Sequence, residues 1–563
     1  MSGLLLVATG CGPAGPGIAV QLQVIGQELS SRGGPLPSAG QPPPGMDAFR
    51  LCVQDAAGRG LVCEDFHDLT MTTVRLEGVP AGANLTVTFQ GYTSDEQTQQ
   101  ADVLWCGRAT GIEVKKNATT TVRMLLGRCG DFNQLSQPMS TGRAFHSATT
   151  LPDGKVLLVG GYQTLSVDNG RCSHPCTILQ ATDSIELFDP ADGSFQPVGH
   201  LAHPRGLHQA LALSDGRVLV VGGCQVATLQ SSFDDLDRPG SPLRCLEPGP
   251  AAVTAELVEP VSATATAVDI PPVLLSAAAR VGKDRLALFG GVDLQGQPLN
   301  RVLLLDVSSG ALTSEQFTGA LTTARAGATA VATAPADASA QEVLLVGGSE
   351  APSPSDPGPF AEWLVVGGGG LTGREPRFVS AAAGVGLPVM HAMATLTAPG
   401  RILIAGGILP ARYLSQETPF LPRPLRLAAV VAAAGDSLEM LDNDHRLGKA
   451  RLFGSLVPLP GQEHTLVAGG FENLRPDRPA RFEPAAAVEV WEEQAGDFAL
   501  LWLRGEPVQL NQARAGHTTT ALPDGTFLLC GGLNGETLLD SAEIFNPFST
   551  SLGEGGLSPT TMP

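Results

Sequence analysis

A short apolar run that ends in Gly-Gly occurs seven times in this chain. The seven doublets end at residues 161, 223, 291, 348, 407, 470 and 532, so 57 to 68 residues separate them. Most doublets follow an apolar segment and a turn such as the PDG at 152–154, and a further strand such as SIELFDP at 184–190 comes after them. Asp-Gly supplies the positive φ that a tight hairpin needs. Each repeat therefore predicts a four-stranded antiparallel sheet, which buries both its faces only if the repeats pack together.

The first and last repeats are nearly the same sequence, RAFHSATTLPDGKVLLVGG at 143–161 and RAGHTTTALPDGTFLLCGG at 514–532. We expect the recurring histidines, His146, His208, His391 and His517, to lie at one place in different repeats. A catalytic or metal-binding histidine needs no copy in each repeat, so we predict a structural role. Each histidine is expected to make a hydrogen bond that holds a strand within its own repeat. Glycine permits close packing and positive φ. The expected structural glycines are Gly160, Gly161, Gly222, Gly223, Gly290, Gly291, Gly347, Gly348, Gly406, Gly407, Gly469, Gly470, Gly531 and Gly532.

Composition limits the partners of this chain. Its 563 residues carry a net charge of −20, and only 16% of them are charged. Nucleic-acid binding needs a basic face, so we expect no nucleic-acid partner. No apolar run reaches the 18 to 20 residues of a transmembrane helix. Among other motifs, GGGGLTG at 367–373 lacks the helix that a dinucleotide-binding loop needs, and we interpret it as a loop.

The amino terminus, MSGLLLVATGCG, resembles the end of a bacterial lipoprotein signal peptide. The resemblance implies that Cys11 carries lipid, with residues 1–11 as the signal remnant, and that the chain contacts membrane only through this lipid. Ala8 stands where Leu is usual and no basic residue precedes Cys11, so an ordinary terminus is the alternative. Residues 12–46 are rich in Pro and Gly and predict a flexible tether. The expected location is the bacterial cell envelope, lipid-anchored at the outer membrane or cell surface, or the periplasm.

Residues 47–130 alternate apolar and polar side chains between turn residues, which predicts a small β-sandwich. Ten cysteines are present, and an even set beside an export signal favours disulfides. Eight are candidates and form four couples along the chain, but local pairing is one of many possible connectivities. They are Cys52, Cys63, Cys106, Cys129, Cys172, Cys176, Cys224 and Cys245. A metal site at CSHPC, with His174 between two cysteines, is the alternative for one couple, although four ligands are not evident.

The pattern R-x-x-H, then Asp-Gly, an apolar run and Gly-Gly resembles the kelch motif. The resemblance covers residues 131–550 and implies an all-β fold, a seven-bladed kelch-type β-propeller preceded by the small β-sandwich. The period is longer than the roughly 50 residues of kelch repeats, and most of the usual Tyr and Trp are missing. Residues 551–563 are a C-terminal tail and a poor strand. We therefore expect residues 131–137 to complete the seventh blade.

The long loops after four doublets, 162–183, 224–253, 408–436 and 471–486, are expected to form a binding face, because function usually sits on variable loops. The sequence thus favours a non-catalytic protein, not an enzyme, that binds a protein or glycan and needs no cofactor or metal. The alternative is a carbohydrate-active enzyme. The kelch resemblance allows a sugar epimerase or, less readily, a galactose-oxidase-like copper oxidase, for which the tyrosines Tyr92, Tyr162 and Tyr413 show no Tyr-His ligand pair. The sequence leaves the oligomeric state open.

Overall fold

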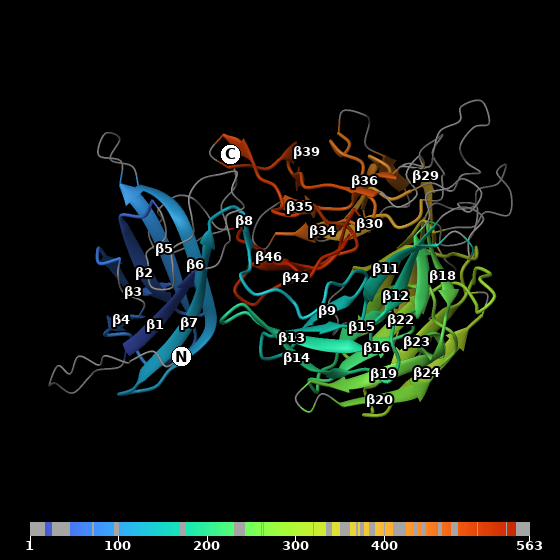
Figure 1. Ribbon diagram of the computed structural model, residues 1–563, viewed down its shortest axis with the longest axis horizontal. Helices are drawn as coiled ribbons and strands as arrows, with labels where there is room; N and C mark the ends of the chain where they lie inside the picture. The colour runs from blue at the N-terminus through green and yellow to red at the C-terminus, as the bar shows by residue number, and fades with distance from the viewer. Residues whose placement is uncertain are drawn as a thin grey trace. The chain divides into compact units, whose positions relative to one another are not determined.

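The computed structural model describes most of the chain (Figure 1). The described residues are 17–24, 45–69, 73–94, 101–168, 170, 176–229, 242–260, 262, 264–318, 320–333, 340–348, 361–367, 370–371, 377–381, 389–398, 400–408, 424–432, 437–440, 445–459, 464–474, 482–503, 505–535 and 537–547. Cys11, Cys172, His174, Tyr413 and the C-terminal tail lie outside them, so the lipid anchor and the couple Cys172/Cys176 remain predictions.

Strands dominate the described residues, and the exception is the single 3-10 turn η2 (Pro250–Val253). This confirms the expected all-β class. No helix in the described ranges has the length and apolar character to cross a membrane. The chain divides into two compact units, the first with residues up to 133 and two short C-terminal pieces, the second with most of 134–545.

The strands of the first unit pair in the order β3-β2-β5-β6-β7-β1-β4, and β6 pairs with β7 only at Trp105 and Cys106. The strands on the two sides of this junction share one buried apolar core. The strands of this unit are β1 (Gly17–Val24), β2 (Ala48–Gln54), β3 (Gly60–Phe66), β4 (Thr73–Glu77), β5 (Gly82–Ser94), β6 (Ala101–Val114) and β7 (Thr119–Arg128). β1 lies inside the expected tether, which is therefore wrong for residues 17–24. The strand pairs parallel with β7 and buries Ile18 and Val20, because GIAVQLQV alternates apolar and polar residues.

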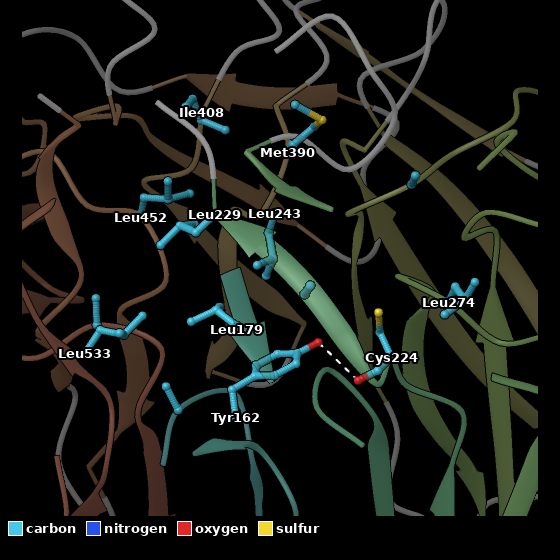
Figure 2. Packing of buried hydrophobic residues seen from close by; sticks show 14 of the residues in the cluster. Tyr162, Leu179, Cys224, Leu229, Leu243, Leu274, Met390, Ile408, Leu452 and Leu533 are labelled. Atoms are coloured by element: carbon cyan, nitrogen blue, oxygen red, sulfur yellow. Dashed lines mark hydrogen bonds between the residues drawn. The ribbon is translucent and has the colours of Figure 1, made fainter. Parts of the chain in front are cut away.

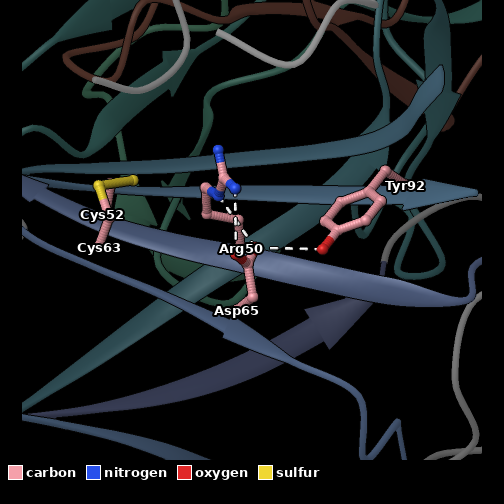
Figure 3. Close-up of a disulfide and its surroundings, with 5 residues drawn as sticks. All are labelled: Arg50, Cys52, Cys63, Asp65 and Tyr92. Atoms are coloured by element: carbon pink, nitrogen blue, oxygen red, sulfur yellow. Dashed lines mark hydrogen bonds and ion pairs between the residues drawn. A yellow bond between two sulfur atoms is a disulfide. The ribbon is translucent and has the colours of Figure 1, made fainter. Parts of the chain in front are cut away.

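A disulfide joins Cys52 of β2 to Cys63 of β3, two residues that face each other in the pairing (Figure 3). Beside it, Arg50 forms an ion pair with Asp65 at 2.9 Å, and the Tyr92 hydroxyl donates to the same carboxylate at 3.1 Å. Arg50 lowers the pKa of Asp65. A second disulfide, Cys106–Cys129, lies in the same unit.

The second unit contains the seven repeats, numbered here 1 to 7 in chain order of their doublets. Each contributes four strands, whose order in the sheet is first, second, third, fourth. They are β9 (Ser147–Thr150), β10 (Val156–Val159), β13 (Ser184–Asp189) and β14 (Ser194–His200) for repeat 1; β15 (Gln209–Ala212), β16 (Val218–Val221), β19 (Thr254–Glu259) and β20 (Thr264–Asp269) for repeat 2; β21 (Ala277–Gly282), β22 (Arg285–Phe289), β23 (Val302–Asp306) and β24 (Thr313–Phe317) for repeat 3; β25 (Thr329–Ala332), β26 (Ala340–Val346), β27 (Ala361–Gly367) and β29 (Arg377–Ala381) for repeat 4; β30 (Met393–Ala398), β31 (Arg401–Ala405), β32 (Ala428–Ala432) and β33 (Ser437–Met440) for repeat 5; β34 (Ser455–Pro458), β35 (His464–Ala468), β38 (Val488–Glu492) and β39 (Asp497–Leu500) for repeat 6; and β42 (Thr518–Ala521), β43 (Phe527–Cys530), β46 (Ala542–Phe545) and β8 (Phe132–Gln134) for repeat 7.

Repeats 4 and 5 are not separate sheets, because their fourth strands β29 and β33 pair in parallel. β28 (Gly370–Leu371) pairs with the end of β27, at Val366 and Gly367. In repeat 5 the third strand is β32, formed by the Ala/Val run that we expected to belong to a long loop. The fourth strand of this repeat is the segment SLEM of β33.

First strands of successive repeats contact one another around the second unit. β9 contacts β15 and β42, β21 contacts β25, β25 contacts β30, β30 contacts β34, and β34 contacts β42. Repeats 2 and 3 are joined by a 3.5 Å hydrogen bond from the side chain of Gln209 to the Ser276 carbonyl. The repeats therefore follow one another around a closed ring, and β8 supplies the fourth strand of repeat 7 as expected.

Two of the long loops form a sheet of their own, which we call the inserted sheet. Its order is β11-β12-β17-β18, and the strands are β11 (Tyr162–Asp168), β12 (Cys176–Ala181), β17 (Val226–Leu229) and β18 (Leu243–Glu247). The first two strands follow the doublet of repeat 1, and the last two follow that of repeat 2. The remaining loop strands pair in short hairpins: β36 (Phe471–Leu474) with β37 (Phe482–Pro484), β40 (Trp502–Leu503) with β41 (Glu506–Pro507), and β44 (Leu533–Asn534) with β45 (Thr537–Leu538).

The inserted sheet packs onto a buried apolar cluster at the centre of the ring, which we call the hub (Figure 2). The hub contains Ala144, Tyr162, Leu179, Cys224, Ala227, Leu229, Leu243, Ala252, Leu274, Val292, Ala326, Met390, Ile408, Leu452, Phe471, Ala515 and Leu533. The described strands of these two loops thus place one set of side chains in the core, whereas β11 keeps others, such as Val167, exposed. The physical reason is their composition, because TILQA and VATL carry apolar side chains that gain free energy on burial.

Candidate functional site

Each repeat opens with a four-residue segment, and the third residue of that segment has positive φ in all seven repeats. We call these third residues the central ring. They are Phe145, Leu207, Leu275, Gly327, His391, Phe453 and Gly516, with φ between 52° and 69°. A left-handed backbone costs a non-glycine residue about 1 kcal/mol or more, and such strain is concentrated at functional sites.

Backbone hydrogen bonds tie the central ring together. Phe145 N donates to Gly516 O at 2.8 Å, and Leu207 N donates to Phe145 O at 3.0 Å. The same link joins Gly327 to Leu275 at 3.1 Å, His391 to Gly327 at 2.8 Å, and Gly516 to Phe453 at 2.8 Å. In these five ring residues the left-handed conformation turns the amide toward the preceding repeat, so a backbone hydrogen bond, which does not depend on the side chain, offsets the strain.

A cavity of about 310 Å³ lies within the central ring. All seven ring residues line it, together with residues at the fourth position such as His146, Ser276 and His517, and with Leu243 of the inserted sheet. Phe145 and Phe453 stand at right angles to each other, with ring centroids 5.2 Å apart. The volume is at the small end of ligand pockets, so the cavity suits a molecule of few heavy atoms.

His146, His208 and His517 occupy the fourth position of their segments and are more than nine-tenths buried. Each Nε2 lies within hydrogen-bond distance of a hydroxyl in the preceding repeat: His208 to Ser147 at 2.8 Å, His146 to Thr518 at 3.0 Å, and His517 to Ser455 at 3.2 Å. The expected bond within one repeat is therefore a bond between neighbouring repeats.

Burial lowers the pKa of these three histidines. It brings His208 and His517 to about 3, helped by the positive charges of Arg205 and Arg514 respectively, and holds His146 well below its usual pKa of 6.5. The Nδ1 atoms of His146 and His517 have no hydrogen-bond partner. An orphaned acceptor is less costly than an orphaned N–H, which favours the neutral tautomer that donates from Nε2.

His391 differs from the other three histidines. It stands at the third position, not the fourth, which Ala392 fills, so the expectation of one common place was wrong by one residue. The bridge between Met390 and Ile408 corresponds to that between Ala144 and Tyr162 and fixes this register. His391 is only partly buried, lines the central cavity and contacts Phe453 with the ring centroids 4.9 Å apart and the ring planes tilted by 55°.

The doublet glycines make room for the next repeat. A Cβ on Gly160 would lie 2.5 Å from Arg205 O and 3.1 Å from the imidazole of His208, both in repeat 2. The following Gly161 donates its N–H to Arg205 O at 2.8 Å and has φ of 92°. The doublet is therefore the surface against which the next repeat packs, and a larger residue would open the ring.

Five buried ion pairs were not predicted from the sequence. The first residue of the segment is an arginine in five repeats, and each pairs with a glutamate on the third strand: Arg143–Glu186, Arg205–Glu256, Arg325–Glu362, Arg451–Glu489 and Arg514–Glu543. Each guanidinium also donates to the carbonyl of the first doublet glycine, at 2.7 to 3.0 Å. The sequence carries one sign of these pairs, because the arginine and the glutamate are always present or absent together. Repeat 3 has Val273 and Leu303 at the two positions, and repeat 5 has Val389 and Ala429.

The remaining cysteines give no metal site in the described part of the chain. Cys224 and Cys245 form a disulfide, and Cys176 is also disulfide-bonded. Cys530 is a free thiol that is completely buried, and burial raises its pKa to about 11. Among the described residues no three His, Cys, Asp or Glu side chains are grouped to hold a metal ion.

A galactose-oxidase-like copper centre does not fit the described tyrosines. Tyr162 is fully buried in the hub, and its hydroxyl donates to the Cys224 carbonyl at 3.3 Å (Figure 2). Burial raises its pKa further above the ordinary value, which disfavours the phenolate that a copper ligand requires. Tyr92 is in the first unit and bonds Asp65. Within the described ranges, two tyrosines and two histidines therefore do not lie close enough together to form the ligand set of such a copper centre.

No protein-family profile matches the sequence, and no curated protein is detectably similar to it. Among solved structures, one match is a fungal alcohol oxidase of the AA5 family in complex with copper. Its sequence is 13% identical, the alignment covers 75% of this chain and 78% of that chain, and the TM-score is 0.48. The matched protein is named as an enzyme, against the expectations that this chain is not an enzyme and that it is a non-catalytic binding protein. Because the sequence identity is low, the substrate and the reaction have to be inferred from this chain's own residues.

Proposed function

We propose that this chain is an enzyme that isomerises a small neutral sugar in the central cavity by proton transfer at His391. The proposal includes the fold, a kelch-type propeller. It is supported by the seven doublets and by the first strands that follow one another around the ring. Neither the proposed reaction nor the proposed family is inferred from the matched oxidase.

One observation carries the proposal. In six repeats the central ring position is Phe, Leu or Gly, and only repeat 5 places an ionisable side chain there. The three neighbouring histidines are buried, each with Nε2 on a hydroxyl, and their lowered pKa makes them weak bases at neutral pH. His391 faces the cavity and is partly exposed, as a general base must be to reach a bound substrate.

The rest of the cavity suits an uncharged sugar. Phe145 and Phe453 present apolar ring surface to the C–H groups of a sugar, and Ser276 and Gln209 add polar groups to the lining. In the reaction, the sugar is bound in its open-chain form, and the His391 imidazole takes a proton from the carbon beside the aldehyde. Water in the open cavity then gives a proton to the opposite face of that carbon, and the imidazolium releases its proton to water. The product is an epimer, so no electrons are transferred and no metal is consumed.

The test is incubation of the purified chain with reducing hexoses in D₂O, followed by NMR for epimer and for deuterium at the carbon next to the carbonyl. His391→Phe should lower the rate about 100-fold or more, the usual share of general acid–base catalysis. Phe stands at the same ring position in repeats 1 and 6, so the variant should fold. His200→Phe, an exposed histidine on β14, is the control and should keep full activity.

Two results would contradict the proposal. One is wild-type epimerisation that survives in His391→Phe. The other is activity that consumes O₂ and is lost on copper removal, which would favour the oxidase instead.

A further inference from the structure

A second cavity, of about 460 Å³, lies beside the central one and is lined by β18 and by the turn at 293–297 of repeat 3. We propose that it is a subsite for a second sugar unit, so that the substrate is a reducing oligosaccharide, with its reducing unit in the central cavity, rather than a free monosaccharide. This inference rests on the proposed function, because the first sugar unit occupies the central cavity.

The two cavities share a wall. Leu275 lines both of them, and β18 runs between them, with Leu243 on the central cavity and Arg244, Cys245 and Leu246 on the second. On this proposal, two linked sugars bind with one unit in each cavity and with the link between them over Leu275, which both cavities share. A monosaccharide reaches only one cavity at a time.

The wall is held in a fixed position. Cys245 of β18 is bonded to Cys224, which follows the doublet of repeat 2, and β18 pairs with β17 along its length. Cys224 and Leu243 also belong to the hub. A wall fixed in advance loses little conformational entropy when a ligand binds, which increases affinity.

The opposite side is a rigid turn with exposed side chains. The Asp293 carboxylate accepts the backbone N–H of Gln295 at 2.9 Å and of Gln297 at 2.8 Å, and Asp293 N donates to Gln297 O at 2.8 Å. The turn is thus fixed by its backbone. The side chains of Gln295, Gln297 and Leu294 are exposed, the last at 45%.

The lining chemistry favours a neutral saccharide over an anion. Primary amides donate and accept at once, which matches sugar hydroxyls, and Leu246, Pro248 and Leu294 offer apolar surface for C–H groups. Arg244 and Asp293 bring one charge of each sign. The chain as a whole carries −20, which disfavours an acidic ligand.

The experiment measures binding of a panel of neutral hexoses and of their disaccharides to the full chain by titration calorimetry. For the best sugar we expect the disaccharide to bind about tenfold more tightly than the monosaccharide. In Gln295→Ala/Gln297→Ala this ratio should fall to about one, while the monosaccharide Kd stays unchanged. Gln196→Ala, an exposed glutamine on β14, is the matched control and should keep the tenfold ratio.

The outcomes separate this subsite from the proposed function. Monosaccharide turnover with equal affinities in the wild type would overturn the subsite alone. Disaccharide binding that depends on Gln295 and Gln297, without any monosaccharide turnover, would support the subsite and contradict the epimerase. A double variant that loses monosaccharide and disaccharide affinity equally would overturn the subsite, and absence of any binding would overturn both.

Discussion

The buried arginines show how a single residue position is fixed by its surroundings. Glu256 accepts N–H bonds from Ala202 and His203 in addition to its pairing with Arg205. In repeat 3, where both charges are absent, the residue equivalent to His203 is Pro271, which has no N–H to satisfy. Ser276 there donates to the Gly290 carbonyl at 3.1 Å, the bond that arginine makes to the first doublet glycine elsewhere. In repeat 3, which lacks the ion pair, the backbone N–H at the position of His203 is thus also absent, and Ser276 satisfies the carbonyl of the first doublet glycine.

A prediction at this scale concerns Arg205. Arg205→Ala leaves Glu256 charged and completely buried without its counter-ion, which should cost about 3 to 5 kcal/mol in the free energy of unfolding. Arg205→Val/Glu256→Leu copies repeat 3 and removes both charges, so it should be more stable than the single variant. Urea denaturation of both measures this.

The control is Arg217→Ala, which breaks the partly exposed pair with Asp215 and should cost about 1 kcal/mol or less. A double variant less stable than Arg205→Ala would show that the carboxylate is held by its N–H donors rather than by the arginine.

At the scale of elements, two strands far apart in the chain complete the sheet of repeat 7. Leu135 N donates to Ala542 O at 2.8 Å and Arg143 N donates to Leu539 O at 3.0 Å, so the segment that begins at β8 runs along the last strand. Without it the edge of β46 would be exposed, and an open sheet edge pairs with other chains. The segment therefore both closes the ring and covers an edge.

Deletion of residues 131–137 should accordingly lower the Tm by about 10 °C or more, because β46 loses its outer partner and the ring loses its closure. Differential scanning calorimetry measures the shift. The matched control deletes seven residues, 233–239, from the connection between β17 and β18, and leaves every described strand intact. Equal Tm values for the two deletions would contradict the role of β8 in closure.

At the scale of the whole molecule, the three buried histidines make the stability of the ring depend on pH. They join repeats 6, 7, 1 and 2 in sequence, and all three must remain neutral while Arg143, Arg205, Arg451 and Arg514 stand nearby. Their pKa in the folded chain is below that of an unfolded histidine, so the unfolded chain binds more protons. Stability is complete above pH 6.5 and is lost as the pH falls toward 3.

The expected loss is about 2 kcal/mol for each histidine between pH 6.5 and pH 5. Urea denaturation at pH 7 and pH 5 measures it, and this window lies above the range in which the carboxylates Asp55 and Asp65, with their lowered pKa, take up protons. The variant His146→Gln/His208→Gln/His517→Gln keeps a donor at each site but does not titrate, so its stability should change much less. An equal loss in both proteins would place the pH dependence elsewhere.

The sequence by itself determined the all-β class, the seven Gly-Gly doublets and the segment that completes the last sheet, because these depend on local turns and on apolar runs that recur at a regular period. Cysteines close in sequence also predicted the three disulfides of the described residues. Only the tertiary structure decided what the long loops and the histidines do. The inserted sheet joins loops of two repeats, and each buried histidine bonds a hydroxyl 61 to 372 residues away, so no local pattern records either contact. The shift of His391 by one position depends on a bridge to Ile408, and that shift places an imidazole on the central cavity.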